Sequence, residues 1–312
     1  MSQDELMEPE GDEQGAHRRR ASAARARLLR QPFEEVIRVA GQAGDPGARV
    51  LGRRPQARSI ATLRVGYPRP RQDDLRRPGL PASKSTSSVK RFGPPHDFDG
   101  NHPEPSERLP RRLEVHLAHV PRNLAGDPTP KVLPVLNGRA FGDALTDNAY
   151  AEDGYRFHDA FHLSYLAVLG WSPVVRALLR RKRKAISLTD EIEDGGRAIV
   201  IEEGISAVLF EAASRSNFFR ESRKIDPGLI RLCRNLTAKL EVSICASREW
   251  ERAILDGYAV WRTLHERGSG AVICDLDSRT IAVRPLSSTE LEGHRQACEA
   301  LTNSSLVARR GT

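Results

Sequence analysis

The order of apolar and polar residues divides the chain into a weakly patterned first third and a strongly patterned remainder. Within residues 1–85, one short amphipathic stretch occurs at residues 32–43, and the rest is rich in Pro, Gly, Arg and Ser. Residues 113–120 alternate between apolar and polar side chains, which predicts a half-buried strand. Residues 132–135 predict a second strand, and Asn137-Gly138 predicts the turn that follows it.

Helical periodicity dominates from residue 153 onward. The start and stop signals are local: Gly170 predicts the end of the first helix, and Ser172-Pro173 and Asp226-Pro227 predict the starts of two others. The predicted helices cover about residues 153–169, 172–184, 190–215, 226–240, 248–266 and 288–300. A hairpin over residues 271–283 precedes the last of them. The predicted class is therefore α+β but mostly α, a helical bundle with a small antiparallel sheet.

Composition places the ordered part of the chain after its first third. Thirteen of the 20 prolines lie before residue 111, and all three tryptophans lie after residue 150. A segment poor in large apolar residues buries too little surface to offset the entropy of its chain. The sequence therefore predicts a disordered or degenerate N-terminal region at residues 1–90, a helical domain at 91–300, and a flexible tail at 301–312.

The formal charge of +8 is unevenly distributed. Residues 1–16 are acidic, and an arginine-rich tract follows, but only 7 of the 49 basic residues are lysine. This bias is typical of a GC-rich genome and favours a solvated tail over a nucleic-acid-binding one. The four cysteines form no C-x-x-C pair, and no apolar run is long enough to span a membrane. These features predict reduced thiols and a cytoplasmic protein.

Two histidines share one face of the first predicted helix. His158 and His162 are four residues apart, so their side chains project in the same direction one turn apart, with Asp159 beside them. Such a pair can chelate one metal ion, and a neighbouring carboxylate can bind the ion or orient a histidine. The alternative is a hydrogen-bonded pair of partly buried histidines next to aromatic residues.

Two adjacent carboxylates interrupt a strongly apolar helix. Glu202 and Glu203 lie in the middle of residues 198–210, where nearly every other position is apolar, so the helix is predicted to be buried. Two carboxylates in a dry environment cannot both stay ionised without a cation. A divalent metal such as Mg²⁺ would satisfy them, and so would salt bridges to arginines such as Arg176 or Arg197.

Other charged residues flank these two helices. Glu193 and Asp194 could complete the metal cluster, or could simply stabilise a helix N-terminus. The run that includes Lys182, Arg183 and Lys184, together with Arg197, could hold phosphate groups, or could be a solvated helix end.

Several of these segments resemble the C-terminal domain of MazG-like nucleotide pyrophosphohydrolases. The resemblance covers about residues 90–285. Its segments are Glu107-Arg-Leu-Pro-Arg111, residues 137–148, Asp153-Gly-Tyr-Arg-Phe-His-Asp-Ala-Phe-His162, Leu169-Gly-Trp-Ser-Pro173, residues 180–184 and residues 191–203.

The resemblance implies a metal-dependent enzyme that cleaves nucleoside triphosphates to monophosphate and pyrophosphate. His158, Asp159, His162, Glu193, Asp194, Glu202 and Glu203 would be the metal ligands, with Glu202 and Glu203 catalytic and Mg²⁺ or Mn²⁺ as the ion. It also implies a homo-oligomer, because helical pyrophosphohydrolases often build their sites between subunits. The family's usual Glu-Glu-x-x-Glu pattern is incomplete, since Ser206 stands at the third position. A non-catalytic accessory or regulatory domain that binds a nucleotide or a partner protein therefore remains the alternative.

Overall fold

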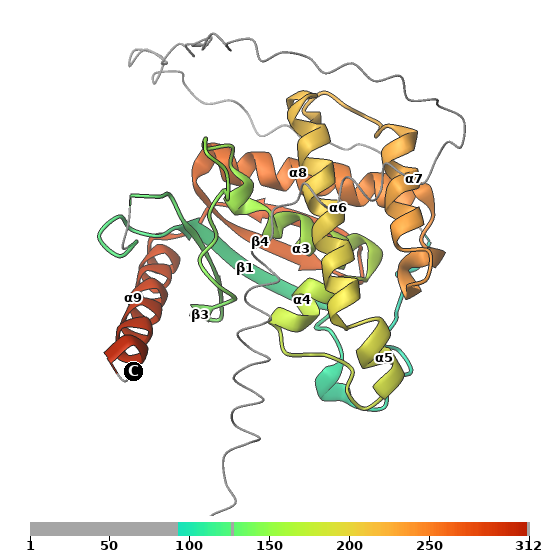
Figure 1. Ribbon diagram of the computed structural model, residues 1–312, viewed down its shortest axis with the longest axis horizontal. Coiled ribbons are helices and arrows are strands. Elements are labelled where there is room, and N and C mark those ends of the chain that lie inside the picture. The colour runs from blue at the N-terminus through green and yellow to red at the C-terminus, as the bar shows by residue number, and fades with distance from the viewer. Residues whose placement is uncertain (1–92, 126–127, 311–312) are drawn as a thin grey trace, which may run out of the picture. The chain divides into compact units, whose positions relative to one another are not determined.

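The computed structural model describes residues 93–125 and 128–310, with side chains up to residue 303. These residues belong to one compact unit of the chain, residues 86–312. The N-terminal region predicted at residues 1–90, with its short amphipathic stretch, lies outside the described residues. The described part is α+β and mostly helical, as predicted (Figure 1).

A five-stranded antiparallel sheet forms the centre of the fold. Its strands are β1 (Arg112–His119), β2 (Val132–Leu136), β3 (Arg139–Ala140), β4 (Ser269–Asp275) and β5 (Thr280–Arg284), in the order β3-β2-β1-β4-β5. The predicted strands and the predicted hairpin are confirmed. Asn137 and Gly138 both have positive φ, at 51° and 73°, as the tight turn between β2 and β3 requires. The short strand β3 was not predicted, because two residues are too few to show an alternation of apolar and polar side chains.

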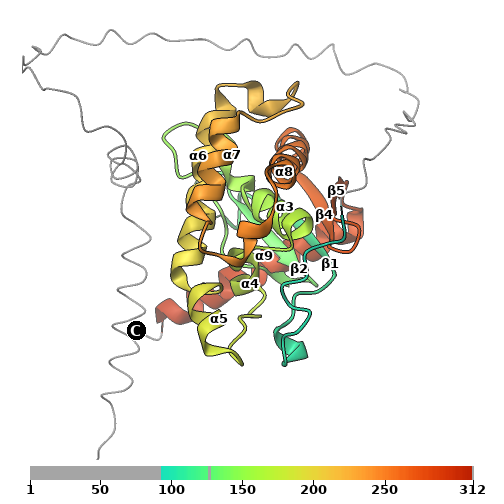
Figure 2. The same ribbon diagram turned by 90° about the vertical axis from the view of Figure 1, so that its right-hand side faces the viewer.

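Helices lie on both faces of this sheet. The helices are α3 (Asp159–Leu169), α4 (Pro173–Leu178), α5 (Ser187–Ile192), α6 (Gly196–Ser214), α7 (Pro227–Leu236), α8 (Ser247–Arg267) and α9 (Ser288–Arg310). Helices α3 and α8 pack against each other and contact β4 and β5, whereas α9 contacts β1, β2 and β3 (Figures 1 and 2). Leu133 and Val135 join α9 in a separate apolar cluster, while Val132 belongs to the main core. Since successive strand residues point to opposite faces, α9 covers the face opposite α3 and α8.

The first four predicted helices differ from the observed ones in their bounds. The helix predicted for residues 153–169 begins at Asp159, after a 3-10 turn at Tyr155–Phe157, and the helix predicted for residues 226–240 ends at Leu236. The helix predicted for residues 172–184 ends at Leu178, and Arg180 has a φ of 58°. The helix predicted for residues 190–215 is two helices, α5 and α6, separated at Gly195, whose backbone is extended. Both interruptions flank one buried ion pair, between Arg183 and Asp194.

The helix α6 is less buried than its composition indicated. Its core-facing residues include Glu202, Ile205 and Leu209, but the side chain of Val200 is 61% exposed. Helix α9 is longer than predicted and continues to Arg310, into the segment expected to be a flexible tail. No helix in the described ranges combines the length and the apolar character that crossing a bilayer would require.

Candidate metal centre

The turn that leads into α3 is fixed by polar contacts from a preceding loop. The carboxylate of Asp147 accepts hydrogen bonds from the backbone N–H groups of Asp153 and Arg156 and forms an ion pair with the Arg156 side chain. Gly154 has a φ of 87°, and a Cβ there would lie 2.4 Å from the ring of His265. Only glycine therefore fits this position, and the turn places His158 at the start of α3.

The ligand atoms of His158, Asp159 and His162 converge at the start of α3. One such atom from each residue lies within 4.8 Å of the others, and all three residues are buried. The Nδ1 atom of His158 lies 2.9 Å from the carbonyl oxygen of Tyr155. Because a carbonyl only accepts, Nδ1 carries the proton and the Nε2 lone pair of neutral His158 is directed away from Tyr155. This Nε2 lies 3.7 Å from Asp159 Oδ1.

Glu202 lies behind His162 and has no solvent exposure. Its Oε1 accepts hydrogen bonds from His162 Nδ1 at 2.9 Å and from the hydroxyl of Ser172 at 2.7 Å. Its Oε2 accepts from the backbone N–H of Val174 at 2.9 Å, in the first turn of α4. The carboxylate thus completes the N-terminal cap of α4 and fixes the proton of His162 on Nδ1.

Glu203 faces the other nitrogen of His162. Its Oε2 lies 3.5 Å from Nε2, and its side chain is 38% exposed, so it forms the solvent-facing edge of the cluster. Burial raises the pKa of Glu203, but the charges of His162 and His158 and the contact with His162 together outweigh burial and lower this pKa to about 2. Among the described residues, His162 Nε2 is a buried nitrogen without a hydrogen-bond partner.

The charges around His162 favour its protonated form when no metal is present. Burial lowers the pKa of His162, but the carboxylates of Glu203 and Glu202 more than offset this effect and raise the pKa well above its usual range. For Asp159, burial raises the carboxyl pKa, against the opposing effect of His158 and His162. A proton and a divalent cation are therefore alternative ways of balancing the same carboxylates.

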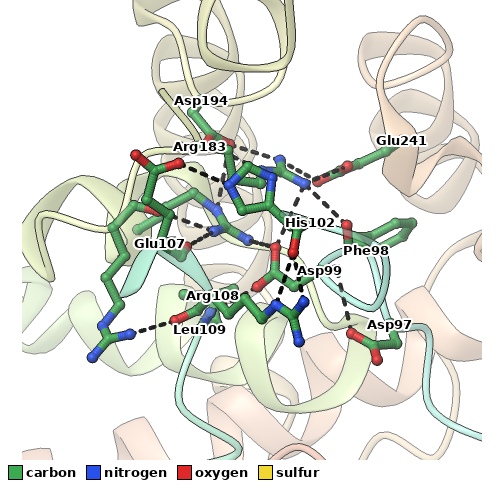
Figure 3. A network of polar contacts seen from close by, with 12 residues as sticks. Asp97, Phe98, Asp99, His102, Glu107, Arg108, Leu109, Arg183, Asp194 and Glu241 are labelled. Atoms are coloured by element: carbon green, nitrogen blue, oxygen red, sulfur yellow. Dashed lines mark hydrogen bonds and ion pairs between the residues drawn. The ribbon is translucent and has the colours of Figure 1, made fainter. Parts of the chain in front are cut away.

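Other predicted site residues belong to a separate buried network, shown in Figure 3. Arg183 donates to both oxygens of Asp194 through Nε and Nη2, at 3.1 and 2.7 Å, and also to Glu241. Glu193 accepts a hydrogen bond from the backbone N–H of Glu241. Glu193, Asp194 and Arg183 thus hold α5, α6 and the segment before α8 together, and the structure does not bring them to the histidine cluster.

The same network includes a residue that the sequence pattern did not reveal. Asp99 accepts hydrogen bonds from Arg176 Nη2 at 2.8 Å and from the backbone N–H of Leu109 at 2.7 Å. Arg176 therefore pairs with Asp99 and lies 3.4 Å from Asp194, whereas the salt-bridge alternative had paired it with the two glutamates. Asp99 sits in an irregular segment without periodicity, so no sequence signal could have identified it.

The remaining predicted phosphate ligands lie at or near the surface. Lys182 is half-buried, and Lys184 and Arg197 are exposed. In the described ranges, no ion pair or hydrogen bond joins these three side chains to the cluster of His158, Asp159 and His162.

The sequence of the chain matches the model of one known protein family. The family model of the MazG C-terminal domain matches residues 93–287, which is more than half of the chain. The chain belongs to the MazG C-terminal domain family. No curated protein and no solved structure gave a significant match.

Every polar cluster described above lies inside the region matched by the MazG C-terminal domain, whereas α9 follows it. The histidine cluster of this MazG-related chain fits a divalent ion. Two imidazole nitrogens and one carboxylate are close enough to share it, with Glu203 adjacent. Within the described residues, Nε2 of His162 has no hydrogen-bond partner and faces Glu203 Oε2 at 3.5 Å, and loss of its proton would leave a lone pair for the ion. Glu202 supplies the carboxylate–histidine contact that usually stands behind a metal-bound imidazole.

Proposed function

We propose that this chain is a metal-dependent hydrolase that cleaves the phosphoanhydride bond of nucleoside triphosphates and releases pyrophosphate. The metal would be held by His158, Asp159, His162 and Glu203. The observation that carries the proposal is the convergence of buried ligand atoms from His158, Asp159 and His162. In the described part of the chain, Nε2 of His162 has no hydrogen-bond partner and lies 3.5 Å from Glu203 Oε2. Membership of the MazG C-terminal domain family supports the choice of substrate class.

The donor set bears on the identity of the ion. Mg²⁺ prefers sites made of oxygen ligands and water, whereas imidazole nitrogen suits transition metals. Two histidines with two carboxylates therefore favour Mn²⁺ over Mg²⁺. When bound, the ion would polarise a phosphate and make a coordinated water more acidic.

The protein side chains would have distinct tasks in this reaction. Glu202 holds His162 in the tautomer that leaves Nε2 free for the ion. Glu203 forms the exposed edge of the cluster, where water and substrate can arrive, and would hold the ion there. The ring of Tyr155 stacks on His158 with centroids 4.5 Å apart, and restricts the rotation of that imidazole.

Metal binding and turnover can be tested on the full-length protein. We expect Mn²⁺ binding by calorimetry and Mn²⁺-dependent pyrophosphate release from dNTPs, both lost or strongly reduced in Glu203→Gln. Glu211→Gln is the matched control, because Glu211 lies on the same helix and is exposed. Undetectable Mn²⁺ binding, or turnover equal in Glu203→Gln and the parent protein, would reject the proposal.

A second candidate is a non-catalytic accessory or regulatory domain. Two observations favour it. Arg183 forms ion pairs with Asp194 and Glu241, so it is not available to bind phosphate. Ser206 stands where the family pattern has a third glutamate, and it is fully buried and donates a hydrogen bond to a backbone carbonyl. In this case Glu203→Ala changes stability and leaves any turnover unchanged. Metal-dependent hydrolysis by the parent protein that exceeds hydrolysis by Glu203→Ala would exclude this candidate.

A further inference from the structure

A groove of about 720 Å³ lies where α7 meets the start of α8, apart from the histidine cluster. Figure 2 shows α7 beside α6, and α7 also contacts α8. The volume is within the range of small-molecule sites in proteins. Its lining comes from the residue before α7's N-cap, from α7 itself, from the connection between α7 and α8, and from the start of α8. No residue of the groove belongs to the candidate metal centre, so a ligand could occupy it independently.

The lining of the groove is strongly cationic. Among its described residues are three arginines, Arg231, Arg234 and Arg248, and one carboxylate, Glu251. Arg231 and Arg234 are three residues apart on α7, so both project toward the groove from the same face of the helix. In the part of the chain that the structure describes, Arg231 is exposed and has no ion-pair partner, and Arg234 donates only to the hydroxyl of Ser247 at 3.1 Å.

The acceptor capacity inside the groove is small. One oxygen of Glu251 accepts a hydrogen bond from the backbone N–H of Ile225 at 3.0 Å. Among the described residues, the groove is thus lined by the guanidinium groups of Arg231 and Arg234 with one partly committed carboxylate, and Arg248 also lines it. Guanidinium groups bind phosphate oxygens through paired hydrogen bonds, so this arrangement suits a ligand with several phosphate oxygens.

Apolar residues also line the groove. Ile225, Pro227, Ile230 and Ala238 line it, and Ile225 and Ile230 are themselves buried, which makes their positions rigid. A flat, weakly polar group would cover this surface, and a bare inorganic anion would leave it exposed to water. The side-chain amide of Asn235, which also lines the groove, offers both a donor and an acceptor to a polar edge.

We propose that this groove binds a nucleoside di- or triphosphate, with the phosphates on Arg231 and Arg234 and the base on the apolar wall formed by Ile225, Pro227 and Ile230. Binding here requires no divalent metal, because the positive charge is supplied by arginines. The groove is a second nucleotide site, separate in its residues from the proposed catalytic centre.

The test uses the full-length protein in EDTA, which removes any contribution of the metal centre. Calorimetric titration with ATP should show binding, with pyrophosphate at least tenfold weaker and adenosine weaker still. The double variant Arg231→Gln/Arg234→Gln should lower the ATP affinity at least tenfold and retain the parent circular dichroism spectrum. The control Arg215→Gln/Arg267→Gln removes the same charge from exposed positions outside the groove and should stay within twofold of the parent.

Three results would overturn the assignment. The first is the absence of ATP binding by the parent protein in EDTA up to millimolar concentration. The second is an equal loss of affinity in both double variants, which would indicate a diffuse effect of net charge. The third is equal affinity for pyrophosphate and ATP, which would exclude a base on the apolar wall. Since no metal is present, none of these results depends on the outcome of the Mn²⁺ experiments.

Discussion

The substitution Glu202→Gln should destabilise the protein severely, although it changes a single atom. Glu202 is fully buried and accepts hydrogen bonds from three donors, on His162, Ser172 and Val174. A glutamine offers one acceptor oxygen, and its amide nitrogen donates. Whichever way the amide is turned, at least one buried donor faces another donor, and protonated His162 loses a charged partner.

The expected cost follows from these contacts. A buried donor left without an acceptor costs about 1–3 kcal/mol. Breaking a buried ion pair by removing one partner costs about 3–5 kcal/mol, and the two effects overlap here. We therefore expect the free energy of unfolding to fall by about 3–5 kcal/mol, a large part of the roughly 5–15 kcal/mol that stabilises a typical domain.

Urea denaturation followed by tryptophan fluorescence measures this change, because Trp171 and Trp250 are buried in the core. With an m-value of about 2 kcal/mol per molar urea, the midpoint should fall by roughly 2 M. Glu203→Gln is the matched control: its side chain is 38% exposed, so its loss should cost about 1 kcal/mol or less. Equal midpoints for the two variants would refute the structural role assigned to Glu202.

Two further predictions concern other buried groups. Asp194→Asn should lower the free energy of unfolding by about 3 kcal/mol or more, because Asp194 is fully buried against Arg183. The exposed control Glu292→Gln should lower it by under about 0.5 kcal/mol. Similar urea midpoints for the two variants would contradict this prediction. Burial raises the pKa of Cys233 and of Cys245 to about 12, so both thiols should resist Ellman's reagent at pH 8 in the folded protein and react in guanidinium chloride. The folded-state pKa values of these thiols lie above the unfolded ones, so the stability that the thiols contribute is complete below about pH 8.5 and is lost as the pH rises toward 12. Rapid labelling of the folded protein at pH 8, or a melting temperature that increases when the pH is raised above 9, would contradict this prediction.

Local signals in the sequence predicted most element boundaries. Ser172 and Asp226 cap their helices with their own side chains, so the starts of α4 and α7 could be predicted from neighbouring residues alone. The break between α5 and α6 lies at Gly195-Gly196, a local signal that the helical periodicity of residues 190–215 outweighed in the prediction. A Cβ at Gly195 would lie 1.9 Å from the carbonyl oxygen of Glu191. The pairing of Asp194 with Arg183 could not be predicted. That partner is set by the tertiary fold, and helical periodicity carries no information about it.

The same distinction applies to the candidate site. The spacing of His158 and His162 on one helix was enough to predict that their side chains lie together, and the structure places them so. The sequence could not assign separate environments to Glu202 and Glu203. Adjacent helical residues point about 100° apart, and only the packing of α6 against the start of α4 determines which glutamate is buried.

Helix α9 shows that the limit of family similarity is not the limit of the folding unit. The similarity ends at residue 287, and α9 begins at Ser288. Its ring of His294 lies 2.9 Å from the carbonyl oxygen of Leu133, and its Ala297 and Cys298 cover Leu133 and Val135. A recombinant protein trimmed at residue 287 would present that apolar strip of sheet to water, and it should be recovered mainly as aggregates.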